Sequence, residues 1–424
     1  MGWVMAVLPL VLLVLGFPIF LILLLTSAVL VLFFMGIPAT QLHITMFGSV
    51  DKFALIAVPF FLFAGELMGR GGISKRIVNW TLALSGNVRG SLGITTVGAC
   101  TIFGALSGSA PATVAALGRL LYNPLRDAGY GERFTNGVLT SSGAIAVVIP
   151  PSIAMILYGA AAEQSVALLF VAGVVPGILM ALMMAAYVYV YATRRDIREG
   201  RPFSWSGVLH ASRDGVWALG TPVIILGGIY AGVVSPTEAA GIACVYAIFV
   251  TRYVYRDIDW KGIWDVAISS MYLTAQVLII VAAAGVYSWL LTVSSVPQNL
   301  VAAIEALKLE PWMLLLAVNL LLLIVGCFLD PNSAILILTP LLIPVMQAHG
   351  VDLIHFGIIM TVNLAIGMFT PPFGLNIFVA QAMFKSPLKT IYPGLVPFIL
   401  VNLVALCFIT YVPGLSLWLT RFVG

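Results

Sequence analysis

Two polar, proline-containing segments recur at a constant distance within an otherwise apolar chain. The first comprises residues 104–113 (GALSGSAPAT), and the second comprises residues 326–333 (GCFLDPNS). Adding 221 to a position in the first copy gives the matching position in the second: Ser109 with Asp330, Thr140 with Thr361, Ser142 with Asn363, and Pro150-Pro151 with Pro371-Pro372. The constant offset indicates an internal duplication, so the fold has to accommodate two related halves.

The composition restricts this fold to a membrane protein. Hydrophobic residues make up 61% of the chain and charged residues 8%, and the mean hydropathy is +1.11, which no soluble domain approaches. Apolar runs of at least about 17 residues, long enough to cross a bilayer, recur at 5–34, 53–69, 135–161, 166–192, 215–234, 237–254, 264–293, 354–382 and 391–420. With polar-tipped segments near 90–121 and 312–347, they predict about ten crossings and two re-entrant hairpins. A Gly16-Phe17-Pro18 break leaves open whether residues 5–34 cross once or twice.

The basic residues predict the orientation of the chain, because loops that face the cytoplasm hold most Lys and Arg. Counting crossings outward from the basic loop after residue 193 places seventeen of the twenty on the cytoplasmic side: Arg70, Lys75, Arg76, Arg89, Arg119, Arg126, Arg133, Arg194, Arg195, Arg198, Arg201, Arg213, Arg252, Arg256, Lys261, Lys385 and Lys389. Only Lys52, Lys308 and Arg421 fall outside. The first hairpin then enters from the cytoplasm and the second from the outer face, so the halves are inverted.

The net charge of +4 is explained by these inner loops, which face anionic membrane lipid. No basic and aromatic patch suggests that the chain binds nucleic acid. Paired aspartates, a serine with a Lys or His base, and a cluster of metal ligands are also missing from the apolar segments, so we do not expect an enzyme. Because the sequence lacks a phosphate-binding Gly-x-x-x-x-Gly-Lys-Ser/Thr loop, ion gradients are the available energy source.

Oxygen-bearing residues gather at the hairpin tips and at a second break across from each tip. A helix broken at membrane depth leaves carbonyl and amide groups that must line a buried or watery cavity, where carbonyl and hydroxyl oxygens suit sodium. We therefore expect two related sodium sites, with these candidate ligands: Ser109, Thr113, Ser141, Ser142 and Gly143 in the first half, and Asp330, Asn332, Ser333, Asn363, Gly367 and Thr370 in the second. Between them we expect a substrate site formed by Ser107, Gly108, Ser109, Pro151, Ser152, Asn332, Pro372 and Asn376.

Structural roles compete with these interpretations. Ser, Thr and Gly are common packing residues in membrane helices. Asp330 suits a functional carboxylate at membrane depth, but it also suits the N-cap of a helix that begins near Ser333. Glu238, in the sequence Ser235-Pro236-Thr237-Glu238, is better explained as a helix cap than as a transport residue, and Glu66 is expected to pair with Arg70.

Five motifs together resemble the large membrane subunit of tripartite ATP-independent periplasmic (TRAP) transporters. They cover nearly the whole chain in order: residues 103–113 (FGALSGSAPAT) with Gly118, 149–153 (IPPSI) with Tyr158-Gly159, 235–240 (SPTEAA), 329–331 (LDP) with Thr339-Pro340, and 370–376 (TPPFGLN). The combination is far more specific than any single motif.

The resemblance implies an all-α polytopic protein with inverted repeats and two re-entrant hairpins, in the elevator-type ion transporter superfamily. It implies four segments: 1–89, N-terminal scaffold and arm helices; 90–192, first transport repeat; 193–311, central loop, scaffold and arm helices; and 312–424, second transport repeat. In these elevator-type transporters, a transport domain that carries both hairpins slides against the scaffold.

The implied function is sodium-driven import of a small organic acid, such as a C4-dicarboxylate or sialic acid, across the bacterial inner membrane. The implied partners are a periplasmic solute-binding protein and a separate small four-helix membrane subunit. A stand-alone divalent-anion or efflux carrier with the same hairpins remains the alternative. Substrate identity, the number of sodium ions, the oligomeric state and the loops that dock the binding protein stay open.

Overall fold

The computed structural model describes residues 2–197 and 203–422, and every regular element in these ranges is helical. Arg198 and Arg201, two of the basic residues used to orient the chain, lie outside the described residues. The first half contains α1 (Gly2–Val14), α2 (Ile19–Leu30), η1 (Val31–Met35), α3 (Thr40–Val50), η2 (Phe53–Ile56), α4 (Ala57–Arg70), α5 (Ile73–Ser85), α6 (Ser91–Ser107), α7 (Ala110–Asp127), α8 (Glu132–Ser142), η3 (Gly143–Val147), α9 (Ile153–Ala162) and α10 (Val166–Arg194).

The second half repeats this order of elements. It contains α11 (Trp205–Tyr230), α12 (Pro236–Phe249), η4 (Val250–Val254), α13 (Trp260–Val293), α14 (Val296–Ala306), α15 (Pro311–Phe328), α16 (Pro331–Ala348), α17 (Leu353–Gly367), α18 (Leu375–Phe384), α19 (Leu388–Tyr411), α20 (Gly414–Leu417) and η5 (Leu419–Phe422). Adding 221 to the bounds of α7, residues 110 and 127, gives 331 and 348, the bounds of α16. The π-helices η1 and η4 also correspond within two residues. The duplication therefore extends from the hairpins into the first helices of the chain.

One pair of equivalent segments differs in continuity. Residues 40–70 form α3, η2 and α4, whereas the equivalent residues 261–291 lie within the single 34-residue helix α13. The interruption in the first half follows Asp51 and Lys52, where the backbone leaves the helical region. The same ancestral segment has thus become a bent element in one half and a straight one in the other.

The apolar runs are divided more finely than the sequence predicted. Seven helices in the described residues are long and apolar enough to cross a membrane, and two of these are the arms of the second hairpin. The remaining predicted crossings fall on shorter or interrupted apolar helices, so the number of about ten crossings stays a prediction. Residues 135–161 and 354–382 are each two short helices that meet at a Pro-Pro pair, because proline lacks the amide hydrogen that a continuous helix needs. Residues 5–34 form two helices, α1 and α2, on either side of Gly16 and Pro18.

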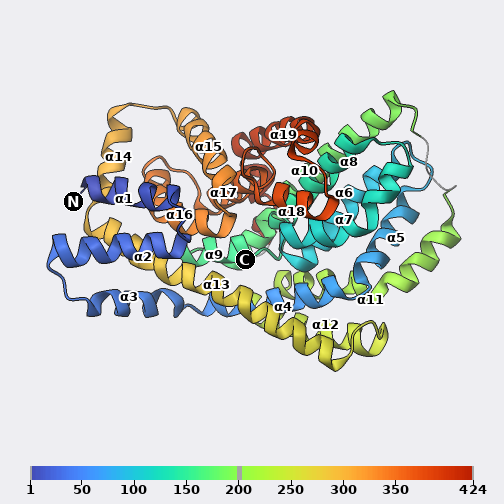
Figure 1. The fold of residues 1–424 in the computed structure, drawn as a ribbon, viewed down its shortest axis with the longest axis horizontal. Coiled ribbons are helices and arrows are strands. Elements are labelled where there is room, and N and C mark those ends of the chain that lie inside the picture. The colour runs from blue at the N-terminus through green and yellow to red at the C-terminus, as the bar shows by residue number, and fades with distance from the viewer. Residues whose placement is uncertain (1, 198–202, 423–424) are drawn as a thin grey trace.

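The helices form two layers (Figure 1). Helices α2, α3, α4, α12 and α13 lie along the lower side of the view, and the hairpin helices lie above them with α8, α10, α17 and α19. The hairpin α6–α7 lies toward the right and α15–α16 toward the left. Contacts between the layers join α4 with α6 and α13 with α16. Lys52 also bridges the layers, since its ammonium donates a hydrogen bond to the Ala160 carbonyl at 2.7 Å. The assignment of the layers to a scaffold and a transport domain stays a prediction.

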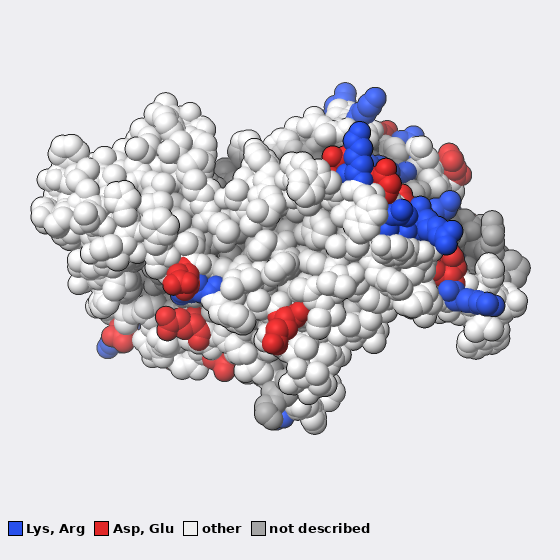
Figure 2. All heavy atoms as spheres, turned by 90° about the horizontal axis from the view of Figure 1, so that it is seen from below, with Lys and Arg blue, Asp and Glu red and all other residues white. Residues whose placement is uncertain are grey.

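The surface charges agree with a membrane-embedded molecule. Figure 2 shows Lys and Arg gathered mainly at one end of the visible face, next to a wide band without charged residues. Large hydrophobic side chains are exposed on helices of the lower layer, including Trp264 and Ile268 of α13 and Val245 of α12. Because such an uncharged, apolar surface is unstable in water, it is the part of the protein that contacts lipid.

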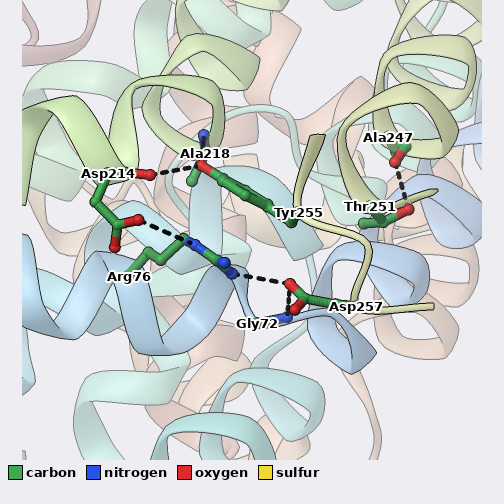
Figure 3. Close-up of polar contacts among 8 residues, drawn as sticks. All are labelled: Gly72, Arg76, Asp214, Ala218, Ala247, Thr251, Tyr255 and Asp257. Carbon is green, nitrogen blue, oxygen red and sulfur yellow. Dashed lines mark hydrogen bonds and ion pairs between the residues drawn. The ribbon is translucent and has the colours of Figure 1, made fainter. Parts of the chain in front are cut away.

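Arg76 fixes the amphipathic helix α5 to the lower layer (Figure 3). Its guanidinium donates a hydrogen bond to Asp257 at 2.8 Å, lies 3.7 Å from Asp214 of α11, and stacks over the ring of Tyr255 at 3.6 Å. Burial raises the pKa of Tyr255, which keeps its hydroxyl protonated to donate to the Asp214 carbonyl. The Gly72 amide also donates to Asp257. One arginine therefore joins α5, α11 and the loop before α13.

Arg76→Ala is expected to destabilise the protein by about 2 kcal/mol, because it removes a charged hydrogen bond and a cation–π contact from a partly buried site. Thermal unfolding of the detergent-solubilised protein measures the effect. Arg70→Ala is the matched control, since Arg70 is half exposed and forms only an i,i+4 pair with Glu66. Equal melting temperatures for the two variants would contradict the role given to Arg76.

Candidate functional site between the hairpin tips

The tip of the first hairpin is closed by a small hydroxyl network. Helix α6 ends at Ser107, Gly108 adopts a left-handed conformation with φ of 57°, and Ser109 is the N-cap residue before α7. The hydroxyls of Ser107 and Thr113 lie 3.0 Å apart, and Thr113 donates to the Ser109 carbonyl at 2.9 Å. A Cβ added to Gly108 would lie 3.0 Å from the Pro151 carbonyl. Glycine is needed at this tip both for its backbone conformation and for its close contact with the opposite break.

The tip of the second hairpin is organised by Asp330. Its carboxylate accepts hydrogen bonds from the backbone amides of Asn332 and Ser333 at 3.1 and 3.2 Å, and from the Ser333 hydroxyl. Asp330 is therefore the N-cap of α16, one of the two roles that the sequence left open. A cap placed at the tip of a membrane hairpin still presents a carboxylate beside the space between the tips.

The break between α8 and α9 packs against the first hairpin. Gly143 is the first residue of η3, and a Cβ added to it would lie 3.2 Å from the Ala110 carbonyl oxygen of α7. A Cβ on Gly104 of α6 would lie 2.6 Å from Cα of Ala146. Beside these contacts the Ser142 hydroxyl is fully buried and has no hydrogen-bond partner in the described part of the chain. Ser141 differs, because its hydroxyl donates to the Gly137 carbonyl at 2.7 Å.

The break between α17 and α18 repeats this arrangement in the second hairpin. An added Cβ on Gly367 would lie 2.6 Å from Cα of Gly326 in α15, so the two backbones touch. Asn363 is fully buried, and its amide nitrogen donates to Asn319 Oδ1 at 2.7 Å and to the Ile359 carbonyl at 2.8 Å. The amide oxygen of Asn363 has no partner among the described residues. Thr370 is satisfied within its own helix turn, by the Ile366 carbonyl.

The unpartnered oxygens of Ser142 and Asn363 occupy equivalent positions, since 142 plus 221 is 363. Buried polar atoms in native proteins are almost always hydrogen-bonded, and each exception needs an explanation. Other buried side-chain oxygens, including those of Thr140 and Asn376, also lack a partner in the described structure. Ser142 and Asn363 form the pair at equivalent positions of the two halves, which is consistent with oxygen ligands for a small cation.

A cavity of about 450 Å³ lies between the two tips and the lower layer. It falls in the usual size range of small-molecule sites. Its upper wall includes the predicted residues Gly108, Ser109, Asp330, Asn332 and Ser333. The lower wall comes from α2, α4 and α13, and its members are Ile19, Phe20, Leu62, Leu273, Gln276, Val277, Ile279 and Ile280. No Lys or Arg is among the described residues that line this cavity.

Other predicted residues lie away from this cavity. Ser107 and Pro151 are buried behind the first tip, and Ser152 caps α9. Asn376 is buried and donates to the Thr140 carbonyl, whereas Pro372 is exposed and its carbonyl accepts a hydrogen bond from Tyr392. Pro151, Ser152, Pro372 and Asn376, the four of these residues that belong to the breaks, therefore have structural roles in positioning the short helices.

Sequence reasoning missed Gln276, the one polar side chain that the lower layer contributes to the cavity in the described structure. The available signal was a lone amide in the middle of an apolar 34-residue helix. A polar side chain at that depth is costly and is a functional candidate for that reason.

Two other acids have the structural roles predicted for them. Glu238 completes a capping box with Ser235 at the start of α12, and Glu66 pairs with Arg70 at 2.7 Å. Glu66 also accepts a hydrogen bond from Ser270 of α13. Within the described ranges, no group of three or more His, Cys, Asp and Glu side chains is arranged to hold a metal ion.

Comparison with known proteins adds an independent finding. The profile of the family described as "Tripartite ATP-independent periplasmic transporter, DctM component" matches residues 6–415. The chain is 41% identical to the C4-dicarboxylate TRAP transporter large permease protein DctM of Pseudomonas aeruginosa, over 94% of each chain. It is 39% identical to the ectoine/5-hydroxyectoine large permease UehC of Ruegeria pomeroyi, over 96% of each chain.

Two further similarities have a narrower meaning. The sialic acid TRAP transporter permease SiaT of Haemophilus influenzae is 35% identical over 86% of this chain, and the match covers 59% of that longer protein. The crystal structure of the Alcanivorax borkumensis YdaH transporter superposes with a TM-score of 0.61 at 15% identity and covers 98% of both chains. At that identity, the likeness to YdaH concerns the fold alone.

Proposed function

The chain belongs to the DctM family of TRAP transporter large permeases, and from this premise we propose that it imports a small organic acid together with sodium ions. The proposed location is the bacterial inner membrane. The members that it resembles are transport permeases, named for C4-dicarboxylate, ectoine and sialic acid. The cavity between the hairpin tips is the proposed site of the acid.

Sodium coupling rests on one observation above the others, the buried and unpartnered oxygens of Ser142 and Asn363. Sodium is a hard cation that binds hydroxyl, amide and backbone carbonyl oxygens. Ser142 lies beside the first hairpin and Asn363 beside the second, so each half offers one candidate ligand. We assign one sodium site to each break. Thr113, Ser141 and Gly143 would supply further oxygens in the first site, and Asp330, Gly367 and Thr370 would supply them in the second.

Recognition of the acid is proposed to rely on helix N-termini. Helices α7 and α16 both begin at the cavity, with Ala110, Pro111, Pro331 and Asn332 in its wall. The positive end of a helix dipole attracts a carboxylate without a basic side chain. At α16 the amides of Asn332 and Ser333 already donate to Asp330, so free first-turn amides are available only at α7. Ser109 and Asn332 add side chains that can hydrogen-bond the bound acid. This arrangement suits a cavity wall that has no Lys or Arg in the described structure.

Alternating access is proposed to follow an elevator movement of the upper layer. A ligand shifts a conformational equilibrium only by its different affinities for the two states. Sodium that joins a hairpin to its facing break would fix that tip against the break, so the loaded and empty carriers would move while the half-loaded carrier would not. The repeated order of elements supports this proposal, because repeats that are inverted in the membrane can adopt two related conformations with opposite openings.

Two partners are part of the proposal. A small four-helix membrane subunit would cover apolar surface of this chain, and a periplasmic solute-binding protein would deliver the acid. The family name supports both, since the transporters are described as tripartite and periplasmic.

Uptake into proteoliposomes tests the proposed function. Vesicles that hold this chain and its small subunit are given radiolabelled succinate, malate or sialic acid, with and without binding protein and an inward sodium gradient. Uptake that requires both the binding protein and sodium is the expected result. Uptake by this chain alone would favour a stand-alone anion carrier, and uptake without sodium would exclude the proposed coupling.

Asp330→Asn separates the charge of Asp330 from its capping role. Asn is as good an N-cap as Asp, so the variant should fold, whereas the loss of the negative charge should weaken activation of uptake by sodium about tenfold. The sodium concentration at half-maximal uptake is the measurement. Asp352→Asn is the control, because Asp352 caps α17 away from the cavity. If both variants show the same sodium dependence, the charge of Asp330 has no role in sodium binding and the residue acts only as a helix cap.

A further inference from the structure

Gln276 has an unusual position for a side chain in the lower layer. It lies near the middle of α13, in a stretch that is otherwise apolar from Ala275 to Ala284, and it faces the cavity with Leu273, Val277 and Ile280. Its side chain is exposed in the absence of lipid and ligand. The upper wall of the same cavity carries both hairpin tips. Among the described residues, Gln276 is thus the polar side chain that faces the cavity from the layer that does not carry the hairpins.

The amide of Gln276 is not satisfied by the protein. The hydroxyls of the other polar residues in this part of α13 have partners, since the Ser270 hydroxyl bonds to Glu66 and the Thr274 hydroxyl donates to the Ser270 carbonyl. Gln276 makes no hydrogen bond to any described residue. An amide in contact with hydrocarbon loses its hydrogen bonds at considerable cost, so this position is stable only against water or a polar ligand.

The fold itself does not require an amide here. Subtracting 221 from 276 gives Leu55, the equivalent residue of the first half. Leu55 also borders a cavity between the layers, of about 230 Å³, and is buried there. The equivalent position in the first half, which lies in the short helix η2, therefore holds an apolar side chain beside its own cavity.

We propose that Gln276 hydrogen-bonds a polar group of the cargo and selects for acids that carry a second polar group, a carboxylate or hydroxyl, in addition to the carboxylate held at the hairpin tips. The inference rests on the proposed function, because it concerns the same cavity. An amide can donate to a carboxylate or a hydroxyl and can accept from a hydroxyl, whereas the other side chains of the lower wall are apolar. An acid with an apolar tail would leave the Gln276 amide unpaired and would bind more weakly.

This contact has a further consequence for transport. In the proposed elevator movement, Gln276 belongs to the layer that stays in place, so the cargo would lose the contact when the hairpins move. The residue should therefore affect binding from one side of the membrane only.

Accessibility tests the position of Gln276 without a known substrate. Gln276→Cys and Ala275→Cys are compared in a Cys407→Ser background, because Cys407 is the exposed native cysteine and the other three are buried. Ala275 is exposed on α13 but does not line the cavity. A hydrophilic maleimide should label Gln276→Cys and leave Ala275→Cys unlabelled. A Gln276→Cys protein that stays unlabelled would show that Gln276 does not face a watery cavity and would overturn the inference.

Selectivity tests the contact with the cargo. Unlabelled succinate and butyrate compete for uptake, since they have the same carbon length and differ in the second carboxylate. Gln276→Leu should reduce the preference for succinate about tenfold, the usual effect of one lost hydrogen bond to a charged group, with an unchanged sodium dependence. Tyr272→Leu, an exposed neighbour outside the cavity lining, is the control.

The outcomes separate the two proposals. If the wild type takes up no acid from the test panel, the proposed function fails, and the labelling result still decides whether Gln276 faces the cavity. Wild-type uptake with an unchanged preference in Gln276→Leu would overturn the inference and leave the proposed function intact. Normal amounts of the Gln276→Leu complex in the membrane exclude misfolding as the cause of a lost preference.

Discussion

Ser142→Ala is expected to reduce sodium-driven uptake at least about tenfold without lowering the melting temperature of the protein. The Ser142 hydroxyl is fully buried and has no hydrogen-bond partner in the described structure. Its removal therefore breaks no bond within the protein, and the loss of an unsatisfied buried hydroxyl is neutral or slightly stabilising. If the hydroxyl is a sodium ligand, the same change weakens the ion site. Uptake as a function of sodium concentration, with thermal unfolding of the same preparation, measures both effects.

Thr135→Val provides the matched control on the same helix. The Thr135 hydroxyl is equally buried but already donates to the Gly131 carbonyl at 2.9 Å. This variant should lose a little stability and keep the sodium dependence of the wild type. If Ser142→Ala takes up the acid as the wild type does at low sodium concentration, Ser142 is not a sodium ligand. The proposed role of Asn363 would then no longer be supported by its equivalence with Ser142.

Gly367→Leu is expected to prevent folding of the second repeat, at a cost of more than about 3 kcal/mol. A Cβ at this position would lie 2.6 Å from Cα of Gly326, which is closer than real Cβ contacts allow. The atoms that the added Cβ would meet all belong to the backbone of Gly326, so no side chain can move aside to make room. The substitution would force α15 and α17 apart. Their contact joins the second hairpin to its break, so this part of the fold would be lost. The fraction of monodisperse protein after extraction, together with its melting temperature, measures the loss.

Gly227→Leu is the control for adding the same side chain to a membrane helix. Gly227 lies within α11, and an added Cβ there meets nothing within 4 Å. This variant should accumulate at wild-type levels. A folded, thermally stable Gly367→Leu protein would mean that the hairpin and the break are not held together by the contact seen in the structure.

Much of the site could be predicted from the sequence because its signals are local. The Pro-Pro pairs mark the two breaks, and the motif Ser235-Pro236-Thr237-Glu238 marks the start of α12, since proline and capping residues act on the backbone within one helical turn. Asp330 and Gly108 mark the tips for the same reason. Because the two halves are offset by 221 residues, each helix start or break in one half predicts one at the equivalent position of the other. The bounds of α7 and α16 agree for this reason.

Other features depend on packing between segments far apart in the chain. Nothing near Ser142 or Asn363 distinguishes them from Ser141 or Thr370, which bond to their own helices; only the neighbouring elements leave two oxygens without a partner. Asn376 and Pro372, predicted to bind substrate, lie outside the cavity because the direction of a short helix after a break is set by the helices around it.

The sequence by itself determined the membrane class, the duplication, the breaks and the caps, because hydropathy, proline and capping residues act through solvent and the nearest turn of backbone. Only the tertiary structure decided that α13 is straight where its counterpart α3–η2–α4 is bent, that Arg76 joins three segments, and that Gln276 faces the cavity. These features are set by the contact of one layer with the other, and that contact depends on side chains more than a hundred residues apart.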